Sequence, residues 1–192
     1  MRKQTNKIAV MASGKGSNLA VILSAIEKGE CAADVAVVIC DKPDAGALAI
    51  AQDAGVPHVL FMNPKEYKSR EAYDVACAEV IQKAGCQLIV LAGYMRILSP
   101  AFIQMFPEQI INIHPSLLPS FKGADAVGDA LRAGVKVSGC TVHMVSEELD
   151  SGKILAQACV PVLEDDDWHS LHARIQEQEH KIYPQAVHQL TK

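Results

Sequence analysis

The alternation of short β-branched runs with longer helical patterns constrains the fold of this chain more than any other feature. Apolar runs predict strands at residues 7–11, 34–40, 58–61, 88–92, 110–113, 137–144 and 154–162, and helical patterns occupy residues 18–28, 46–54, 69–83, 124–133 and 168 to the end. This order predicts an α/β, Rossmann-like, mostly parallel seven-stranded sheet with helices on both faces. The last two runs leave no room for a crossover helix, so the last strands are expected to be antiparallel.

The length of 192 residues fits one domain with a well-buried core. We expect residues 1–100 to form a mononucleotide-binding half and residues 101–192 to carry the remaining chemistry. No repeat or flexible linker divides the two halves.

Charge and composition exclude several classes of function. The net charge is −4 and aromatic residues make up 5%, so the chain has neither the basic face nor the stacking surface of a nucleic-acid binder. Its longest apolar run, LIVLAGYM from Leu88, is far shorter than the roughly 20 residues of a membrane span. The six cysteines never form CxxC, which favours free thiols over disulfides or a metal site. We therefore expect a cytoplasmic protein without a metal.

A glycine-containing loop, SGKGSNL at residues 13–19, follows the first predicted strand. Gly14 and Gly16 permit a tight turn, and the N-terminus of the next helix presents free N–H groups to a phosphate. Leu19 replaces the third glycine of the dinucleotide fingerprint, and the GK[ST] of a P-loop is missing. The alternative is an ordinary strand-to-helix turn capped by Ser17 or Asn18.

The segment INIHPSLLPS, residues 111–120, places Asn112 and His114 two residues apart at the end of a predicted strand that Pro115 terminates. Both side chains then project to the same side, at the sheet edge where ligands bind in open parallel sheets. A carboxamide beside an imidazole can stabilise an oxyanion. The alternative is a buried, hydrogen-bonded histidine beside an asparagine turn.

A third candidate is Asp150 in ELDSG, between the last two strands. Near His114 its carboxylate would favour the imidazolium and hold a water for proton transfer, although Asp-Ser-Gly is also a common turn. His143 is either a support for this site or an ordinary strand histidine.

Five segments occur in an order that resembles the glycinamide ribonucleotide formyltransferase family of purine biosynthesis. They are SGKGSNL, SREAYD at residues 69–74, LAGYMRILSP at 91–100, NIHPSLLPSFKG at 112–123 and QEQEHKIYP at 176–184. The resemblance runs from about residue 7 to residue 184. It implies a formyltransferase-type fold whose second half, residues 101–192, is the folate-binding and catalytic half.

The resemblance also implies roles for individual residues. Gly16, Ser17 and Asn18 hold the substrate phosphate, and Gln176 and Glu179 lie on its sugar and amine side. The folate site comprises Arg70, Met95, Arg96, Ile97, Leu98, Asn112 and the loop Val145, Ser146, Glu147, Glu148, Leu149 and Asp150. Taken without the family, Arg70 is equally an exposed residue of a helix first turn and residues 95–98 are a strand exit.

The implied reaction moves the formyl group of 10-formyltetrahydrofolate to the glycine amine of glycinamide ribonucleotide, without metal or ATP, in a monomer or homodimer. The amine is the nucleophile, and the chain has no GxSxG elbow or Cys–His signature of a covalent mechanism. Asn112 and protonated His114 stabilise the oxyanion, while Asp150 organises a proton-relaying water.

Several alternatives and two departures accompany this interpretation. Methionyl-tRNA formyltransferase and formyltetrahydrofolate hydrolase resemble the 112–119 stretch, an NAD-dependent dehydrogenase could use Asp41 on a ribose, and a nucleotide-binding module needs no chemistry. Asp125 stands where many relatives have histidine, and Lys153 where proline is common.

Overall fold

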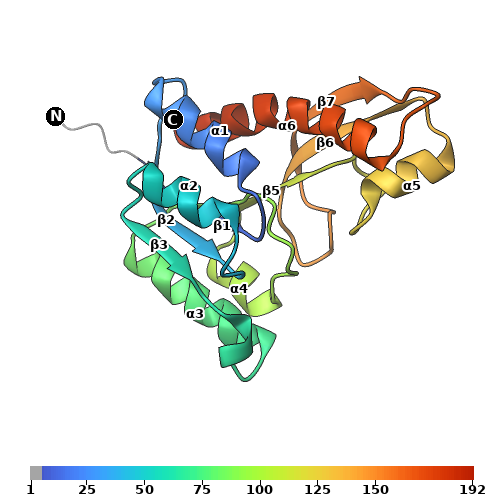
Figure 1. The fold of residues 1–192 in the computed structure, drawn as a ribbon. Helices are drawn as coiled ribbons and strands as arrows, with labels where there is room; N and C mark the ends of the chain where they lie inside the picture. Colours follow the sequence, from blue (N-terminus) through green and yellow to red (C-terminus); the bar gives the residue numbers. More distant parts are fainter. Residues whose placement is uncertain (1–5) are drawn as a thin grey trace.

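The computed structural model describes residues 6–192, which form one seven-stranded sheet with helices on both sides (Figure 1). The strands are β1 (Asn6–Ala12), β2 (Ala33–Cys40), β3 (His58–Phe61), β4 (Leu88–Leu91), β5 (Ile110–His114), β6 (Val137–Met144) and β7 (Ile154–Pro161). The helices are α1 (Ser17–Glu27), α2 (Gly46–Asp53), α3 (Arg70–Lys83), α4 (Pro100–Met105), α5 (Ala126–Ala133) and α6 (Trp168–Leu190), with a short 3₁₀ helix at Pro64–Glu66. All seven predicted strands are present.

The spatial order of the strands is β3-β2-β1-β4-β5-β6-β7. The pairs from β3 to β5 are parallel, whereas β6 is antiparallel to both β5 and β7. The prediction of a mostly parallel sheet with antiparallel last strands is confirmed. The order reverses between β1 and β4, where the carboxyl ends of neighbouring strands leave a crevice for a ligand.

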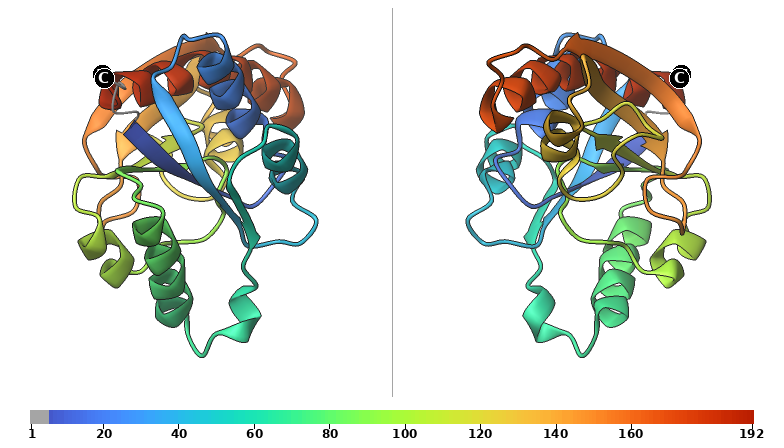
Figure 2. Two further views of the ribbon diagram at one scale, coloured as in Figure 1. Left: turned by 90° about the vertical axis from the view of Figure 1, so that its left-hand side faces the viewer. Right: turned by 90° about the vertical axis from the view of Figure 1, so that its right-hand side faces the viewer.

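Two layers of helices cover the sheet because its strands are apolar on both faces, as buried parallel strands require (Figure 2). Leu19 and Ile22 of α1 pack with Ile175 and Tyr183 of α6 in one core cluster, which also takes in residues of α2 and α5. The other face is covered by α3 and α4. Tyr183 donates from its hydroxyl to the Leu91 carbonyl at 2.9 Å, so α6 is fastened to the centre of the sheet.

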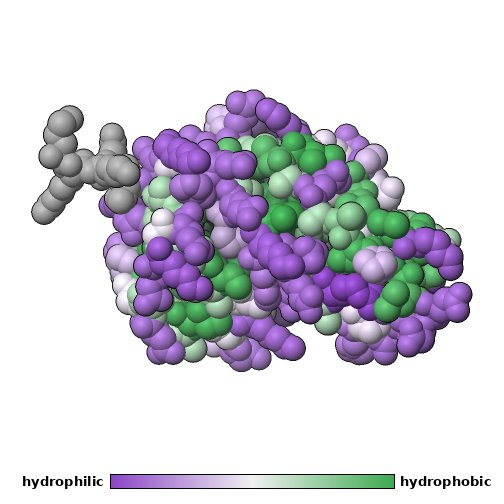
Figure 3. Space-filling model, turned by 90° about the horizontal axis from the view of Figure 1, so that it is seen from above, coloured by the Kyte–Doolittle hydropathy of each residue, from purple (hydrophilic) through white to green (hydrophobic). Residues whose placement is uncertain are grey.

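The outer surface of the α1 and α6 layer carries hydrophilic residues interspersed with apolar ones (Figure 3). Apolar residues gather toward the end of the molecule that holds α5, β6 and β7. The helices are therefore amphipathic and bury one stripe each.

The structure contains one α-helix that the periodicity did not predict. Helix α4 has six residues and is capped by Ser99, whose Oγ accepts from the Phe102 amide at 3.4 Å. Six residues are too few to display a 3.6-residue period, although Ser-Pro is a recognised helix start.

Candidate active site

The loop after β1 is shaped by Gly16, which precedes α1 with φ 82°. A Cβ at this position would lie 2.7 Å from the Ala47 Cα, so both the positive φ and the close approach require glycine. Since glycine has no side chain to cap α1, the first-turn N–H groups remain available to an anion. This is the geometry that the sequence predicted for a phosphate loop.

Helix α6 closes over this loop through two hydrogen bonds. Asn18 donates from Nδ2 to Glu179 Oε2 at 3.0 Å, and Gln176 donates from Nε2 to Ser17 Oγ at 3.1 Å. Glu179 is buried, and burial raises the pKa of its carboxyl, partly opposed by the Asn18 bond and the charge of His114. Four of the predicted phosphate and amine-side residues thus lie together, although they are about 160 residues apart in sequence.

His114 lies at the carboxyl end of β5 with an acceptor at each ring nitrogen. Its Nε2 is 2.8 Å from the Phe121 carbonyl, and its Nδ1 is 3.5 Å from Asp150 Oδ2. A carbonyl can only accept, so Nε2 carries a proton and donates to Phe121, while Nδ1 faces the Asp150 carboxylate. The buried imidazole is therefore fixed in orientation between a carbonyl and a carboxylate.

Asp150 reaches His114 from the connection between β6 and β7. Its backbone has φ 49°, and its Oδ2 accepts from the Gly123 amide at 2.9 Å. A positive φ at a non-glycine residue is uncommon and marks a constrained turn. The structure brings Asp150 next to His114, a proximity that only the resemblance to the formyltransferase family implied.

His143 links the predicted residues into one group. Its Nδ1 lies 2.9 Å from the Met144 carbonyl, and its Nε2 lies 3.4 Å from Asn112 Nδ2 and 3.7 Å from Asp150 Oδ1. Burial lowers the pKa of His143, so the ring is neutral at neutral pH, with Nδ1 donating and Nε2 accepting from Asn112. This contact orients the Asn112 amide group, so a supporting role for His143 is our prediction.

The segment of residues 95–98 emerges from β4 beside the phosphate loop, where the Met95 amide donates to Ser13 Oγ at 2.9 Å. Met95 is 75% exposed and Ile97 is 60% exposed, whereas Leu98 packs in the core beneath them. The Arg96 guanidinium lies 5.0 Å from the centre of the Tyr73 ring. Arg70 is exposed at the first turn of α3.

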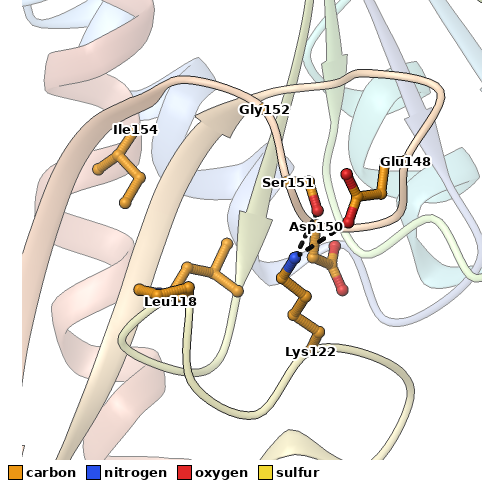
Figure 4. Close-up of a pocket in the computed structure, with 8 residues that line it drawn as sticks. Leu118, Lys122, Glu148, Asp150, Ser151, Gly152 and Ile154 are labelled. Atoms are coloured by element: carbon orange, nitrogen blue, oxygen red, sulfur yellow. Dashed lines mark hydrogen bonds and ion pairs between the residues drawn. The ribbon is translucent and has the colours of Figure 1, made fainter.

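The loop at residues 145–151 borders a cavity of about 180 Å³. Lys122 points across this cavity toward Ser151 Oγ and toward Glu148, whose Oε1 is 3.5 Å from Nζ (Figure 4). Next to Glu148 in the same loop, Glu147 Oε1 accepts from Gln104 of α4 at 3.0 Å. Side chains from two other segments thus hold the loop, and Asp150 also lines the cavity.

Polar side chains of β6 and β7 fix the chain that follows His114. Thr141 Oγ1 donates to the Ser116 carbonyl at 2.7 Å and accepts from the Leu118 amide at 3.0 Å. Gln157 Nε2 donates to the Leu118 carbonyl at 2.9 Å. These bonds hold the turn that brings the Phe121 carbonyl to His114.

Comparisons with known proteins identify the family of this chain. The Formyl transferase family matches residues 6–187. The chain belongs to this family. It is 44% identical to phosphoribosylglycinamide formyltransferase of Bacillus subtilis, over 96% of this chain and 94% of that protein. It is 42% identical to the trifunctional purine biosynthetic protein adenosine-3 of Bos taurus, covering 94% of this chain but 18% of that protein. The crystal structure of glycinamide ribonucleotide transformylase 1 from Symbiobacterium toebii matches with a TM-score of 0.94 at 48% identity, over 97% of this chain and 88% of that one.

Asp125 and Lys153, the two departures from the formyltransferase pattern, make contacts within the fold. Asp125 caps α5 by accepting from the Gly128 amide at 3.3 Å, pairs with Arg132 at 2.7 Å and accepts from Trp168 Nε1 at 3.3 Å. Lys153 is exposed, and its carbonyl accepts from the Met144 amide at 2.9 Å. Asp125 therefore serves to join α5 to α6.

Sequence reasoning did not assign Phe121, Thr141, Gln157 or Lys122 to the site. Phe121 acts through its carbonyl, a group that every residue has, and the other three act through pairings that only the fold creates. Ser13, the first residue of the SGKGSNL motif, was also not assigned to the site. Its position as a polar residue beside the glycines was the one signal that could have indicated its contact with Met95.

Metal-binding groups, membrane-spanning helices and cysteine thiols bear on other classes of function. Within residues 6–192, no group of three or more His, Cys, Asp or Glu side chains is arranged to hold a metal ion. In the same part of the chain, no helix has the length and hydrophobicity to cross a membrane. The cysteines of residues 6–192 are free thiols, and burial raises the pKa of several, including Cys77 to about 12.

Proposed function

We propose that this chain transfers the formyl group of 10-formyltetrahydrofolate to the glycine amine of glycinamide ribonucleotide, releasing formylglycinamide ribonucleotide and tetrahydrofolate. One observation carries the proposal: His114, Asp150, His143 and Asn112 form a connected group at the edge of the sheet. Purine biosynthesis enzymes among its relatives support the choice of reaction.

The phosphate and amine of the substrate have suitable partners at the N-terminal end of α1. The N–H groups after Gly16 and the Ser17 hydroxyl suit the phosphate. Asn18 Oδ1 is buried with no donor among residues 6–192, so it can accept from a sugar hydroxyl or the amine. Glu179 supplies a carboxylate to the same end.

Attack of the amine on the formyl carbon places negative charge on the formyl oxygen. The Asn112 amide has a second N–H besides the one directed to His143, and it can donate to this oxygen. The His114 Nδ1 lies 3.5 Å from Asp150, longer than a good hydrogen bond, so an N–H at this position keeps the capacity to donate to the oxyanion. Two donors, one of them positively charged, then stabilise the tetrahedral intermediate.

The proton balance involves Asp150. The attacking nitrogen gives up a proton as the bond to the formyl carbon forms, and the folate N10 needs one as its bond to that carbon breaks. A water held by the Asp150 carboxylate, on the side of the 180 Å³ cavity, can carry this proton. No covalent enzyme intermediate is required.

The folate is proposed to lie between the 95–98 segment and the 145–150 loop. Met95 and Ile97 offer exposed apolar surface to its flat ring, and backbone groups of the loop can read the ring edge. Arg70, exposed at the start of α3, is proposed to face the acidic tail of the folate.

The test mixes purified protein with glycinamide ribonucleotide and 10-formyltetrahydrofolate, without ATP, and follows tetrahydrofolate and formylglycinamide ribonucleotide. Asn112→Ala, His114→Ala and Asp150→Asn are each expected to lower kcat by roughly 10²–10³ while the circular dichroism spectrum is unchanged. His58→Ala, an exposed histidine on the edge strand β3, is the matched control. Near-full activity of the His114 variant would remove the catalytic assignment.

The same assay separates the alternatives. A formyltetrahydrofolate hydrolase would release formate at the same rate with and without glycinamide ribonucleotide. A nucleotide-binding module would bind the ribonucleotide and consume no formyl folate. The expected cytoplasmic location and the monomer or homodimer state belong to the same proposal, and size-exclusion chromatography tests the latter.

A further inference from the structure

Asp74 is a buried carboxylate that the proposed reaction does not use. It is 1% exposed and lies on α3, within the SREAYD segment. Burying a carboxylate is costly unless it is paired and hydrogen-bonded, so its partners indicate what it supports. Burial raises the pKa of Asp74, and the Ser99 amide, Arg96 and Arg70 act in the opposite direction.

The main partner of Asp74 is the backbone amide of Ser99, the residue that directly follows the 95–98 segment. Its Oδ2 accepts from the Ser99 amide at 2.6 Å, a short distance typical of a charged acceptor. Ser99 also begins α4. Asp74 therefore fixes the point where the segment ends, through a bond between α3 and the chain after β4.

The segment is also fastened at its other end. The Met95 amide donates to Ser13 Oγ, and the Ser13 amide donates to the Gly93 carbonyl at 3.1 Å. Between these two attachments lie the exposed Met95 and Ile97 side chains and Arg96, which stacks on Tyr73 next to Asp74 in sequence. Two apolar side chains are thus presented to solvent on a backbone that is held at both ends.

One carboxylate oxygen of Asp74 is still able to accept a hydrogen bond. Its Oδ1 is buried without a hydrogen-bond partner among residues 6–192, and the same is true of the hydroxyls of Tyr73 and Tyr94 and of the Arg96 Nε–H. Buried polar atoms of this kind commonly bind ordered water. Asp74, Tyr73, Tyr94 and Arg96 therefore form a group of buried polar atoms below the exposed apolar side chains of Met95 and Ile97.

We propose that Asp74 is a positioning residue for the folate cosubstrate, because its carboxylate fixes the Ser99 end of the segment on which the ring rests. The inference depends on the proposed function. Loss of the Asp74 bond loosens Met95 and Ile97 and reduces folate binding, while the phosphate loop keeps its contacts with α6. The effect falls on the KM for 10-formyltetrahydrofolate and on tetrahydrofolate affinity.

The experiment compares Asp74→Ala and Asp74→Asn in the full chain. Asp74→Ala removes the acceptor and is expected to raise the folate KM by about tenfold or more, as the loss of a charged hydrogen bond does. Asp74→Asn keeps an oxygen for the Ser99 amide and restores most of this loss. The KM for glycinamide ribonucleotide stays within about twofold in both. Glu79→Gln, an exposed carboxylate on the same helix, is the matched control.

A second pair of variants removes the donor instead. Ser99 has φ −73°, which proline adopts, so Ser99→Pro deletes the N–H with little change of backbone, while Ser99→Ala removes only the hydroxyl. Ser99→Pro is expected to raise the folate KM as Asp74→Ala does. Ser99→Ala is expected to leave it near the wild-type value.

Tetrahydrofolate binding by calorimetry gives a readout that does not need turnover. A wild-type protein that neither binds tetrahydrofolate nor makes product contradicts the proposed function itself. If the wild type is active, but Asp74→Ala and Ser99→Pro only lower the melting temperature and keep wild-type folate KM and affinity, Asp74 has a structural role and the positioning inference is overturned.

Discussion

The two sides of the candidate site are held in different ways. On the phosphate side, Asn18 of α1 bonds to Glu179 of α6 in the protein interior, and Gly16 fits against the backbone of α2. On the folate side, the 145–151 loop is held by exposed pairs, Lys122 with Glu148 and Gln104 with Glu147. Buried charged hydrogen bonds are costly to break, whereas exposed ion pairs contribute about 0–1 kcal/mol.

This difference suits a reaction with two substrates. The phosphate side is preorganised, so a small anion binds without reordering the chain. The exposed pairs of the folate side are weaker, so we expect the 145–151 loop to open at lower cost than the phosphate side. Opening would have to break the bond of Asp150 to the Gly123 amide and its contact with His114.

Gly16→Ala should have the largest effect on the free energy of unfolding, because it strains the backbone of the phosphate side directly. The new Cβ would meet the Ala47 backbone at 2.7 Å, and alanine at φ 82° is strained, so we expect a loss of about 2–3 kcal/mol in the free energy of unfolding. Gly29→Ala is the control, since φ is 75° but nothing lies within 4 Å of its Cβ, leaving only about 1 kcal/mol of strain. Chemical denaturation measures both. Equal losses would mean that the close approach to α2 does not matter.

Glu179→Gln tests why a carboxylate is buried on the phosphate side. Burial raises its pKa above 4.5, so the folded protein binds the proton more tightly than the unfolded chain does. The free energy of unfolding of the wild type therefore falls as the pH rises from 4.5 through the raised value, and the glutamine variant lacks this loss. The variant should gain relative stability over that range while its KM for glycinamide ribonucleotide rises about tenfold, or about 1.4 kcal/mol. Denaturation curves between pH 4 and about 8 decide the sign.

His143 stands between the two sides, facing Asn112, Asp150, His114 and the Met144 carbonyl. Its pKa is lowered from 6.5 chiefly by burial, so protonation favours the unfolded chain and the free energy of unfolding falls as the pH drops below 6.5 toward the lowered value. His143→Phe should remove this slope. It should also lower kcat about threefold to tenfold, because Asn112 loses the acceptor that orients it.

His143→Gln, which offers an acceptor without a proton to titrate, should recover part of the rate and still lack the slope. A His143→Phe protein with wild-type kcat would show that the Asn112 amide is oriented by other groups. The pH profile of kcat and the denaturation curves are both needed to separate these outcomes.

How much the sequence predicts also differs between the two sides. The loop after β1 is local, so glycines after a strand and before a helix sufficed to predict its tight turn and its free helix N-terminus, while phosphate binding stays a prediction. The folate side depends on pairings between distant segments, and nothing in ELDSG alone indicates that Asp150 reaches His114. Asn112 and His114 were predicted from strand alternation, but the Phe121 carbonyl that fixes the histidine proton is a backbone group. Helix α4 was missed because six residues carry too little periodicity.

Lys122→Met should have the smallest effect, since it removes one exposed ion pair, with Glu148, that holds the 145–151 loop. The Lys122–Glu148 pair is screened by solvent, so we expect a rise of about twofold in the folate KM at low salt and no change in the free energy of unfolding beyond roughly 0.5 kcal/mol. Lys153→Met, an exposed lysine just after the same loop, controls for the change of net charge.

Salt sharpens this last comparison. At about 1 M salt the screening length is about 3 Å, so the wild type should approach the folate KM of the Lys122 variant, while the KM for glycinamide ribonucleotide in the variant and the wild type should respond to salt alike. If Lys122→Met instead lowered kcat as far as Asp150→Asn, the loop would depend on this single lysine. The folate side would then be as firmly held as the phosphate side, and the division between a rigid and a movable half of the site would be wrong.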